Sequence, residues 1–235
     1  MSFQVWGVMS SLGLQDMSEV EMSTNRVAKV RATDDLRGAI ERYGFVGTMR
    51  LFRDLVLSKL ICVKVRLIRH PYYFRGIRAI DFGVGFTSGV GLRIDAFGNG
   101  PHQVQFGSNV QVGDYVHIGA VESVRIGNNV LMASKVYISD HDHGTYSGDG
   151  FPVSLPTELQ SEKLLLVAPV CIGNNVWLGE GVCVLKGVSI GDNSIIGAAS
   201  VVNKSIPPNS IAVGIPAKVV KHFDFELNMW VPVRG

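Results

Sequence analysis

The 235-residue chain lacks several features that mark secreted, disulfide-bonded or membrane-spanning proteins. It has three cysteines, Cys62, Cys171 and Cys183, in no C-x-x-C spacing, so no disulfide framework is expected. Lys or Arg interrupts the longest apolar stretches every few residues, which leaves no run of about 20 apolar residues that could span a bilayer. The first residues also lack the basic region of a signal peptide. These absences predict a reduced, cytoplasmic location.

The charge distribution is uneven although the net charge is only +2. Residues 35–78 contain ten Lys or Arg against three acidic residues, interspersed with apolar runs such as "LFRDLVLSKLICVKVRLI". A basic amphipathic segment of this kind suits the surface of an anionic membrane, and the inner membrane is the candidate. The alternative is that its apolar side packs on the rest of the protein or on a neighbouring subunit. The sequence leaves both open.

The C-terminal half repeats with a period of six residues. Four glycines follow directly after aliphatic members of this repeat, and a second small or branched residue comes four positions after each aliphatic one. The aliphatic positions are Ile172, Leu178, Val184, Ile190, Ile196 and Val202, and the second positions are Val176, Val182, Val188, Ser194, Ser200 and Ile206. The aliphatic row is expected to point inward, whereas outward residues such as Trp177 and Val182 would need cover.

A period of six fits neither an α-helix nor a β-meander. It is the spacing of a triangular solenoid, in which each side is a short strand and each corner a tight turn. Three sides make a coil of 18 residues, so Ile172 should stack on Ile190 and Asn175 on Asn193. Asn, Asp and Gly at the corners are the residues that tolerate positive φ.

The same repeat is present upstream, with two irregularities. It is shifted by two residues at "AVES", and the 34 residues from Ile138 to Ile172 are no multiple of six, so the chain is expected to leave the solenoid over about 140–168. Long loops on rigid scaffolds are where function concentrates. The upstream repeat positions are Ile80, Phe86 and Leu92, then Phe106, Val112 and Ile118, then Ile126, Met132 and Ile138.

The N-terminal region shows no hexads. Residues 34–70 have mixed helical periodicity, and Pro71 is expected to end that helix. The predicted organisation is a partly helical basic segment at 1–78, a β-solenoid at 79–215 and a C-terminal tail at 216–235.

The hexads, the interrupted repeat "KVYISDHDHG" and the segment "IGNNVWLGEGVCVLKGVSIGDNSIIGAASVVNKSIPPNSIAVGIPAKVVK" together resemble the hexapeptide-repeat acetyltransferases, such as the galactoside and maltose acetyltransferases. The stretch "RLIRHPYYFRGIRAIDFGVGFTSGVGLRI" further resembles the branch that O-acetylates bacterial surface polysaccharides. The resemblance covers roughly residues 66–221. It implies a mainly β fold, a left-handed parallel β-helix with an N-terminal helical segment and a short C-terminal tail. The left hand is a property of the family.

The resemblance also implies a function and an assembly. The function is acetyl transfer from acetyl-CoA to a hydroxyl of a polysaccharide sugar, or of its lipid-linked precursor, with a histidine as general base. The implied assembly is a homotrimer with each active site between two subunits. No nucleic-acid partner is expected.

The general base is expected within "DHDH". In the family a histidine lies five residues after the inward aliphatic residue of the interrupted repeat, which is Ile138 here, so His143 is the first candidate and His141 the second. Neutral imidazole is the natural base near pH 7, and Asp140 or Asp142 could orient it. Alternating His and Asp also suggest a metal site, but two neighbouring histidines do not make a ligand shell, and no metal is expected.

The coenzyme contacts of the family match positions in the coils after the loop and in the tail. Trp177 matches an aromatic residue beside the coenzyme, and the other matching positions are Glu180, Ala198, Asn203, Lys204, Lys218 and Lys221. Several depart from the family pattern: Glu180 replaces a small hydroxyl residue, Asn203 a threonine, and the two tail lysines arginines. A lysine can still meet a phosphate as a point charge, though not with two parallel hydrogen bonds.

Two other functions remain open. One is N-acetylation of a nucleotide-linked amino sugar on the same scaffold, although such enzymes usually carry a nucleotide-binding domain ahead of the solenoid. The other is a non-catalytic scaffold at a membrane surface. Thioester cleavage would separate both enzymes from the scaffold.

Overall fold

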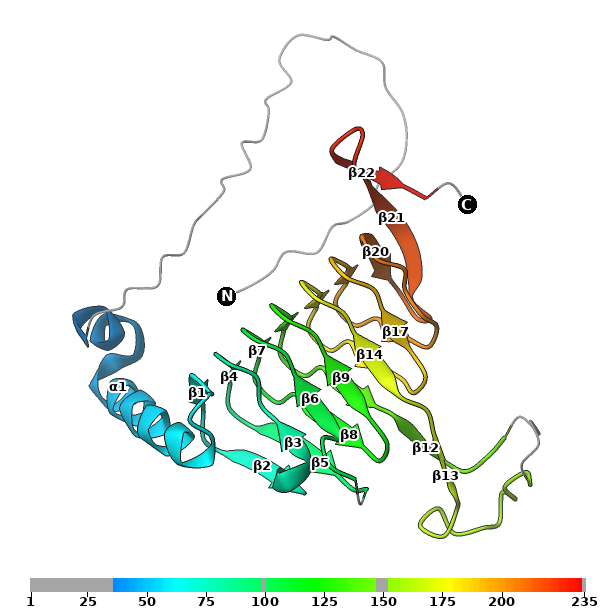
Figure 1. Ribbon diagram of the computed structural model, residues 1–235, viewed down its shortest axis with the longest axis horizontal. Coiled ribbons are helices and arrows are strands. Elements are labelled where there is room, and N and C mark those ends of the chain that lie inside the picture. The colour runs from blue at the N-terminus through cyan, green and yellow to red at the C-terminus, as the bar shows by residue number, and fades with distance from the viewer. Residues whose placement is uncertain (1–35, 99, 147–151, 234–235) are drawn as a thin grey trace, which may run out of the picture.

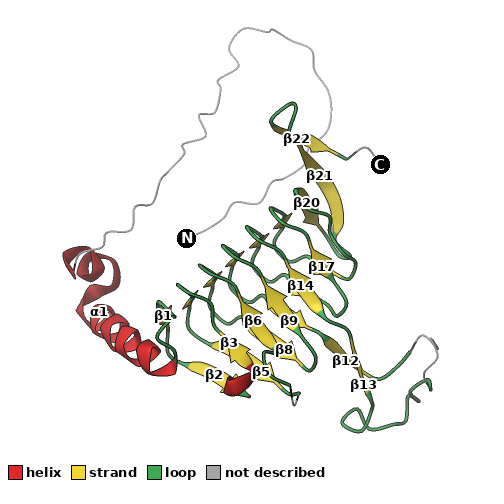
Figure 2. Cartoon of the chain, in the orientation of Figure 1, coloured by secondary structure: helices red, strands yellow, loops and turns green. Residues whose placement is uncertain are grey.

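The computed structural model describes residues 36–98, 100–146 and 152–233. The chain forms a parallel β-solenoid of stacked coils, with helix α1 at one end and an antiparallel meander at the other (Figure 1). A ribbon of two strands leaves the side of the stack (Figure 2). The fold is mainly β, as predicted.

Three sheets form the sides of the solenoid, and their strands are mostly two or three residues long. They are parallel except at the C-terminal end of sheet A, where the last pairings are antiparallel. Sheet A contains, in spatial order, β1 (Leu67–Ile68), β4 (Thr87–Ser88), β7 (Gln111–Val112), β10 (Leu131–Met132), β15 (Trp177–Leu178), β18 (Ile195–Ile196), β20 (Ser210–Val213), β21 (Lys218–Asp224) and β22 (Met229–Pro232). Sheet B contains β2 (Tyr72–Arg75), β5 (Leu92–Ala96), β8 (His117–Ala120), β11 (Tyr137–Ser139), β16 (Cys183–Val184) and β19 (Val201–Val202). Sheet C contains β3 (Ile80–Asp81), β6 (Val104–Phe106), β9 (Val124–Ile126), β14 (Val170–Ile172) and β17 (Ser189–Ile190).

The predicted register after the loop is confirmed. Ile172 pairs with Ile190, 18 residues later, and the aliphatic row of this half is buried. The prediction that Val182 points outward is wrong: its side chain is fully buried, because the second row also points into the core, whereas Trp177 is exposed. At one corner the side-chain amide of Asn175 donates a hydrogen bond to Asn193 at 2.9 Å, and both residues have positive φ. The aliphatic rows therefore fill one core, while the amide ladder satisfies the turns.

The coil just before the loop has 20 residues, because Ile118 pairs with Ile138 and Phe106 with Ile126. The coil before it has 24, because Ile80 pairs with Val104. The two-residue shift at "AVES" is thereby confirmed. Ile80, Phe86 and Leu92 are buried and six apart, but they belong to the other inward row, since Ile80 pairs with Val104 and not with Phe106.

Helix α1 (Leu36–Ile61) ends earlier than the sequence predicted, and non-helical backbone at Gly44 interrupts it. The prediction that it ends at Pro71 is wrong. Val65 and Ile68 are fully buried in the solenoid core, and β1 and β2 pair in parallel with β4 and β5. The chain therefore enters the first coil before residue 71, and the short helix η1 (Ile77–Ala79) follows β2.

Polar groups attach α1 to the first coil. The Ser58 hydroxyl accepts the Ile68 N–H at 2.7 Å, and the buried Asp54 carboxylate accepts the His70 N–H at 3.3 Å. The opposite side of the helix exposes large apolar residues, among them Phe45, Phe52 and Leu60. Over the ranges that the structure describes, no helix is long and apolar enough to cross a membrane.

Candidate active site

Extra residues gather at one corner of the solenoid, between sheets B and C. In a regular coil a single residue, Gly187, separates the positions that open and close this corner, Lys186 and Val188. Seven residues separate the matching Ala96 and Val104, three separate Ala120 and Val124, and 29 separate Asp140 and Val170. These enlargements occur in three successive coils, so they stack into one irregular edge.

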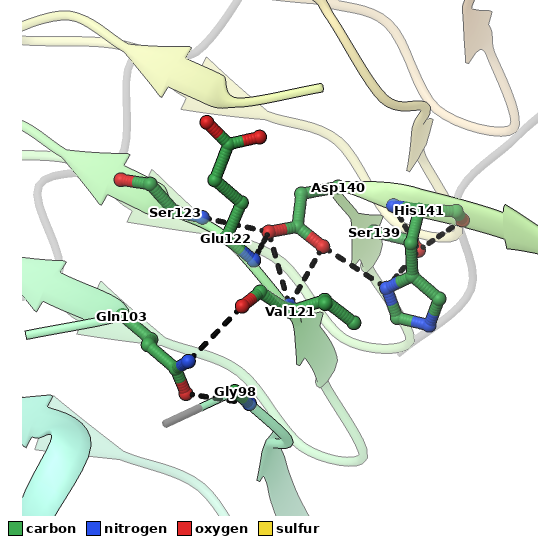
Figure 3. A network of polar contacts seen from close by, with 8 residues as sticks. All are labelled: Gly98, Gln103, Val121, Glu122, Ser123, Ser139, Asp140 and His141. Carbon is green, nitrogen blue, oxygen red and sulfur yellow. Dashed lines mark hydrogen bonds and ion pairs between the residues drawn. The ribbon is translucent and has the colours of Figure 1, made fainter. Parts of the chain in front are cut away.

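The middle enlargement wraps around the carboxylate of Asp140, which is fully buried. The backbone N–H groups of Val121, Glu122 and Ser123 donate to it at 2.9, 2.7 and 2.8 Å, respectively (Figure 3). Hydrogen bonds to an ionised acceptor are about twice as strong as neutral ones, and three of them satisfy a charge that could not otherwise be buried. The two extra residues of the 20-residue coil thus build an anion-binding turn for one side chain.

A second layer holds this turn. The Gln103 side chain, 2% exposed, donates from Nε2 to the Val121 carbonyl at 3.0 Å and accepts the Gly98 N–H at 3.1 Å (Figure 3). The first enlarged corner therefore supports the second through one buried amide.

Asp140 fixes the ring of His141 at the start of β12 (His141–His143). His141 Nδ1 lies 3.0 Å from Asp140 Oδ1, and the His141 side chain is 12% exposed. A carboxylate has no proton to donate, so Nδ1 is the donor, which leaves Nε2 as the acceptor nitrogen. The ring lies over Gly119, where an added Cβ would come within 3.2 Å of His141 Cε1. This arrangement presents one basic nitrogen in a defined direction.

His143, two residues along the same strand, has a different environment. Its side chain is exposed, and its ring has no hydrogen-bond partner among the described residues. Its carbonyl accepts the Tyr146 hydroxyl at 2.9 Å. Strand β12 pairs in antiparallel fashion with β13 (Leu165–Val167), so the ribbon carries both histidines, whose ring centroids are 6.2 Å apart. The family register favoured His143, whereas the hydrogen bonds orient only His141.

Two of the predicted coenzyme residues lie at the corner that carries Asp140 and His141, which we call the dyad. Ile138, Val184 and Val202 pair in succession, so Asn203 and Lys204 occupy that corner two coils further on. Lys186 lies at the same corner, in the coil between Asp140 and Lys204, although its sequence position did not mark it as a site residue. Its Nζ is 3.4 Å from Asp142 Oδ2. Counting back one 18-residue coil from Lys204 would have found it.

The remaining predicted coenzyme residues lie elsewhere on the protomer. Trp177 is half-exposed on sheet A, while Glu180 and Ala198 stack at the corner between sheets A and B. Glu180 forms an ion pair with Lys135 at 3.4 Å. Lys218 and Lys221 are exposed on β21. One protomer therefore does not gather all of the predicted residues at one site.

A second carboxylate–imidazole pair lies on sheet B. Asp95, 4% exposed, accepts Arg93 Nε at 2.6 Å and lies 3.1 Å from His117 Nε2, with Arg75 Nε at 3.6 Å. Burial alone would raise the pKa of Asp95, but the hydrogen bonds from Arg93 and His117 and the charges of Arg93 and Arg75 lower it below its ordinary value.

Comparisons with known proteins agree with this architecture. The model of the family described as "Bacterial transferase hexapeptide (six repeats)" matches residues 172–204. The chain is 47% identical over 190 residues, 81% of its length and 95% of the relative's, to WbbJ of Escherichia coli K12, named as an O-acetyl transferase of lipopolysaccharide biosynthesis.

Two solved structures are similar in fold. A maltose O-acetyltransferase of Clostridium difficile 630 has a TM-score of 0.53 and 29% identity, over 74% of this chain and 88% of that one. The N-acyltransferase AntD of Bacillus cereus, in complex with dTDP and 3-hydroxybutyryl-CoA, has a TM-score of 0.59 and 19% identity, over 73% and 89%. At that identity the second likeness concerns the fold alone.

Proposed function

The chain belongs to the hexapeptide-repeat acetyltransferases, and we propose that it moves an acetyl group from acetyl-CoA to a hydroxyl of a bacterial polysaccharide sugar or its lipid-linked precursor. The observation that carries the proposal is the buried Asp140 carboxylate holding His141 beside a projecting ribbon. Likeness to WbbJ over 95% of that protein supports O-acetylation in particular.

The dyad supports direct transfer. His141 Nε2 removes the proton of the acceptor hydroxyl while the hydroxyl oxygen forms a bond to the thioester carbonyl carbon. Asp140 stabilises the imidazolium that results, as an ion pair in a buried setting. Collapse of the tetrahedral intermediate breaks the carbon–sulfur bond, and His141 returns the proton to the departing thiolate. The enzyme ends in its starting state without a covalent acyl intermediate.

The geometry favours His141 over His143 as this base. A general base needs a fixed direction for its lone pair, and the hydrogen bond from His141 Nδ1 to Asp140 supplies it. His143 is close enough, at 6.2 Å between ring centroids, to contact the acceptor or the coenzyme from the ribbon. We therefore assign the two histidines as base and contact residue, in the reverse of the order that the family register gave.

The distribution of the coenzyme residues favours a homotrimer. Trp177, Glu180 and Ala198 lie at a different edge of the protomer from His141 and Lys204, and a neighbouring subunit would bring one edge against the other. Lys204, Lys218 and Lys221 then supply charge for the phosphates of acetyl-CoA, with Asn203 beside them. Light scattering should give three times the protomer mass, and an active monomer would contradict the assembly.

Helix α1 supports peripheral contact with an anionic membrane. Polar residues hold the helix to the solenoid, while Phe45, Phe52 and Leu60 are exposed, as is Arg50. Each Lys or Arg near such a surface contributes about 1 kcal/mol. Sedimentation with anionic vesicles at low and high salt tests this: no binding at low salt would assign the apolar side to a subunit contact.

The decisive assay follows thiol release from acetyl-CoA with and without a carbohydrate acceptor. An O-acetyltransferase releases thiol when the acceptor presents a hydroxyl, and mass spectrometry finds the acetyl ester on the sugar. Turnover confined to amino sugars linked to a nucleotide would support the N-acetyltransferase instead. If no acceptor causes thiol release, the result would favour the non-catalytic scaffold.

A further inference from the structure

A pocket of about 850 Å³ opens on sheet B near the N-terminal end of the solenoid. Its outward lining includes Tyr73, Arg75, Arg93 and Asp95, from β2 and β5. Tyr73 pairs with Arg93, and Arg75 with Asp95, so the four form a compact square of neighbouring side chains. A pocket that combines an aromatic residue with a few fixed polar groups is the usual form of a small-molecule site.

The proposed base lies on the same side of the sheet as the pocket. Along one outward row, Asp95 pairs with Gly119, and the His141 ring lies over Gly119, one strand or about 5 Å from Asp95. Phe97 contacts residues of both sites. Its ring is 6.0 Å from the ring of His141, and the Arg75 guanidinium lies over the Phe97 ring at 5.3 Å.

The charges in the pocket leave an excess cation. Asp95 is engaged by Arg93 and His117 and stays ionised, since these partners lower its pKa. Two guanidinium groups face one carboxylate, which gives a charge of +1 with His117 neutral. Among the described residues the structure records no hydrogen bond from the terminal nitrogens of Arg75 or Arg93. Guanidinium groups suit phosphate and carboxylate, because each can donate two parallel hydrogen bonds.

We propose that this pocket binds an oxyanion carried by the acceptor, a phosphate ester attached to the sugar, while a hydroxyl of the same sugar reaches His141. The proposal rests on the proposed function and names the acceptor class: a glycosyl phosphate and not a neutral glycoside. Tyr73 and Phe97 supply apolar faces on either side of the sugar. A sugar carboxylate has the same chemistry, and the test separates the two.

Isothermal titration of the full chain in a phosphate-free buffer tests this assignment. Three probes with the gluco configuration are compared: α-D-glucose 1-phosphate, methyl α-D-glucuronide and methyl α-D-glucopyranoside. Titrations with saturating coenzyme A keep the coenzyme site occupied. We expect the phosphate to bind at least tenfold more tightly than the neutral glycoside in both conditions. Tighter binding of the glucuronide than of the phosphate would overturn the phosphate assignment.

Three variants locate the binding. Arg75→Gln should weaken the phosphate at least tenfold, a loss of about 1.4 kcal/mol or more, while Arg75→Lys should retain part of the affinity as a point charge. Arg125→Gln, an exposed arginine on β9 of sheet C, is the matched control and should bind as the wild type does. Phosphate binding unaffected by Arg75→Gln, or equal binding of the neutral glycoside, would refute the proposal. Thiol release measured on the same preparations distinguishes a failed pocket in an active enzyme from a failed function.

Discussion

Sheet B carries two buried carboxylates that each contact an imidazole, and they are held in different ways. Asp140 is held by three backbone N–H groups of one turn, and its histidine is the next residue in the chain. Asp95 is held by the side chains of Arg93 and His117, which come from its own strand and from the next. The backbone donors fix the position of the Asp140 carboxylate, whereas the long side chains around Asp95 chiefly balance its charge.

The difference separates two roles that the same residue types can have. At Asp140 the charge is satisfied by the fold, so its hydrogen bond to His141 orients a ring that is otherwise free to act. At Asp95 the carboxylate neutralises part of a cationic cluster, and His117 Nε2 is occupied by that contact. An imidazole whose Nε2 has no hydrogen-bond partner among the described residues, as in His141, can serve as a base. One whose Nε2 contacts a carboxylate, as in His117, is better suited to structure or binding.

Removing each imidazole should give the largest contrast. His141→Ala is expected to lower kcat by roughly 10²–10⁴ with the fold intact, because the general base is lost. His117→Ala should leave kcat within about tenfold of wild type. Thiol release and circular dichroism measure the two effects. His143→Ala completes the set: if it abolishes turnover while His141→Ala is active, the family register identified the base correctly and the dyad is structural.

Changing the first carboxylate should affect both activity and stability. Asp140→Asn keeps the size of the side chain, but its NH₂ group would face backbone N–H donors at one of the two positions where oxygen now accepts. The loss of a charge-assisted set of hydrogen bonds should cost about 2–4 kcal/mol of unfolding free energy. Turnover should fall by about 10²-fold or more because the tautomer of His141 is no longer fixed. Urea unfolding and thiol release measure these; an unchanged midpoint would contradict the proposed anchoring.

A smaller perturbation can move the ring without changing its partners. In Gly119→Ala the added methyl group would meet His141 Cε1 at 3.2 Å, which is tight enough to displace the imidazole by a few tenths of an ångström. A misplacement on this scale should lower kcat by roughly tenfold. Gly100→Ala is the control, because nothing lies within 4 Å of its added methyl group. Equal kcat values for the two variants would show that the position of the ring is not limiting.

The sequence predicted most of the solenoid and little of the site geometry. The hexads identified the inward aliphatic row because burial repeats with the same period as the coil, as Ile172 over Ile190 shows. The two-residue shift at "AVES" was visible, but its purpose was not, since no periodicity says that three N–H groups converge on Asp140. The Asp95 cluster was missed for the same reason: its members are joined across strands by side chains. The signal that the sequence did offer was the extra residues that recur at one corner in successive coils, since these mark the position of the site.

The smallest expected effect concerns the second carboxylate and its pH dependence. The pKa of Asp95 is lower in the folded protein than in the unfolded chain, so its contribution to stability is present above the unfolded value, about 4, and is lost as the pH falls through the folded value. Asp95→Asn removes charge-assisted hydrogen bonds and should cost about 1–2 kcal/mol at pH 7. The gap between variant and wild type should narrow below about pH 4, because the unfolded wild-type chain then binds a proton at Asp95 more readily than the folded protein does. Urea midpoints measured from pH 7 to pH 3 follow this gap. A gap that stays constant over that range would mean that Asp95 contributes through packing, and the contrast between a charge-balancing carboxylate and an orienting one would have to be drawn from Asp140 alone.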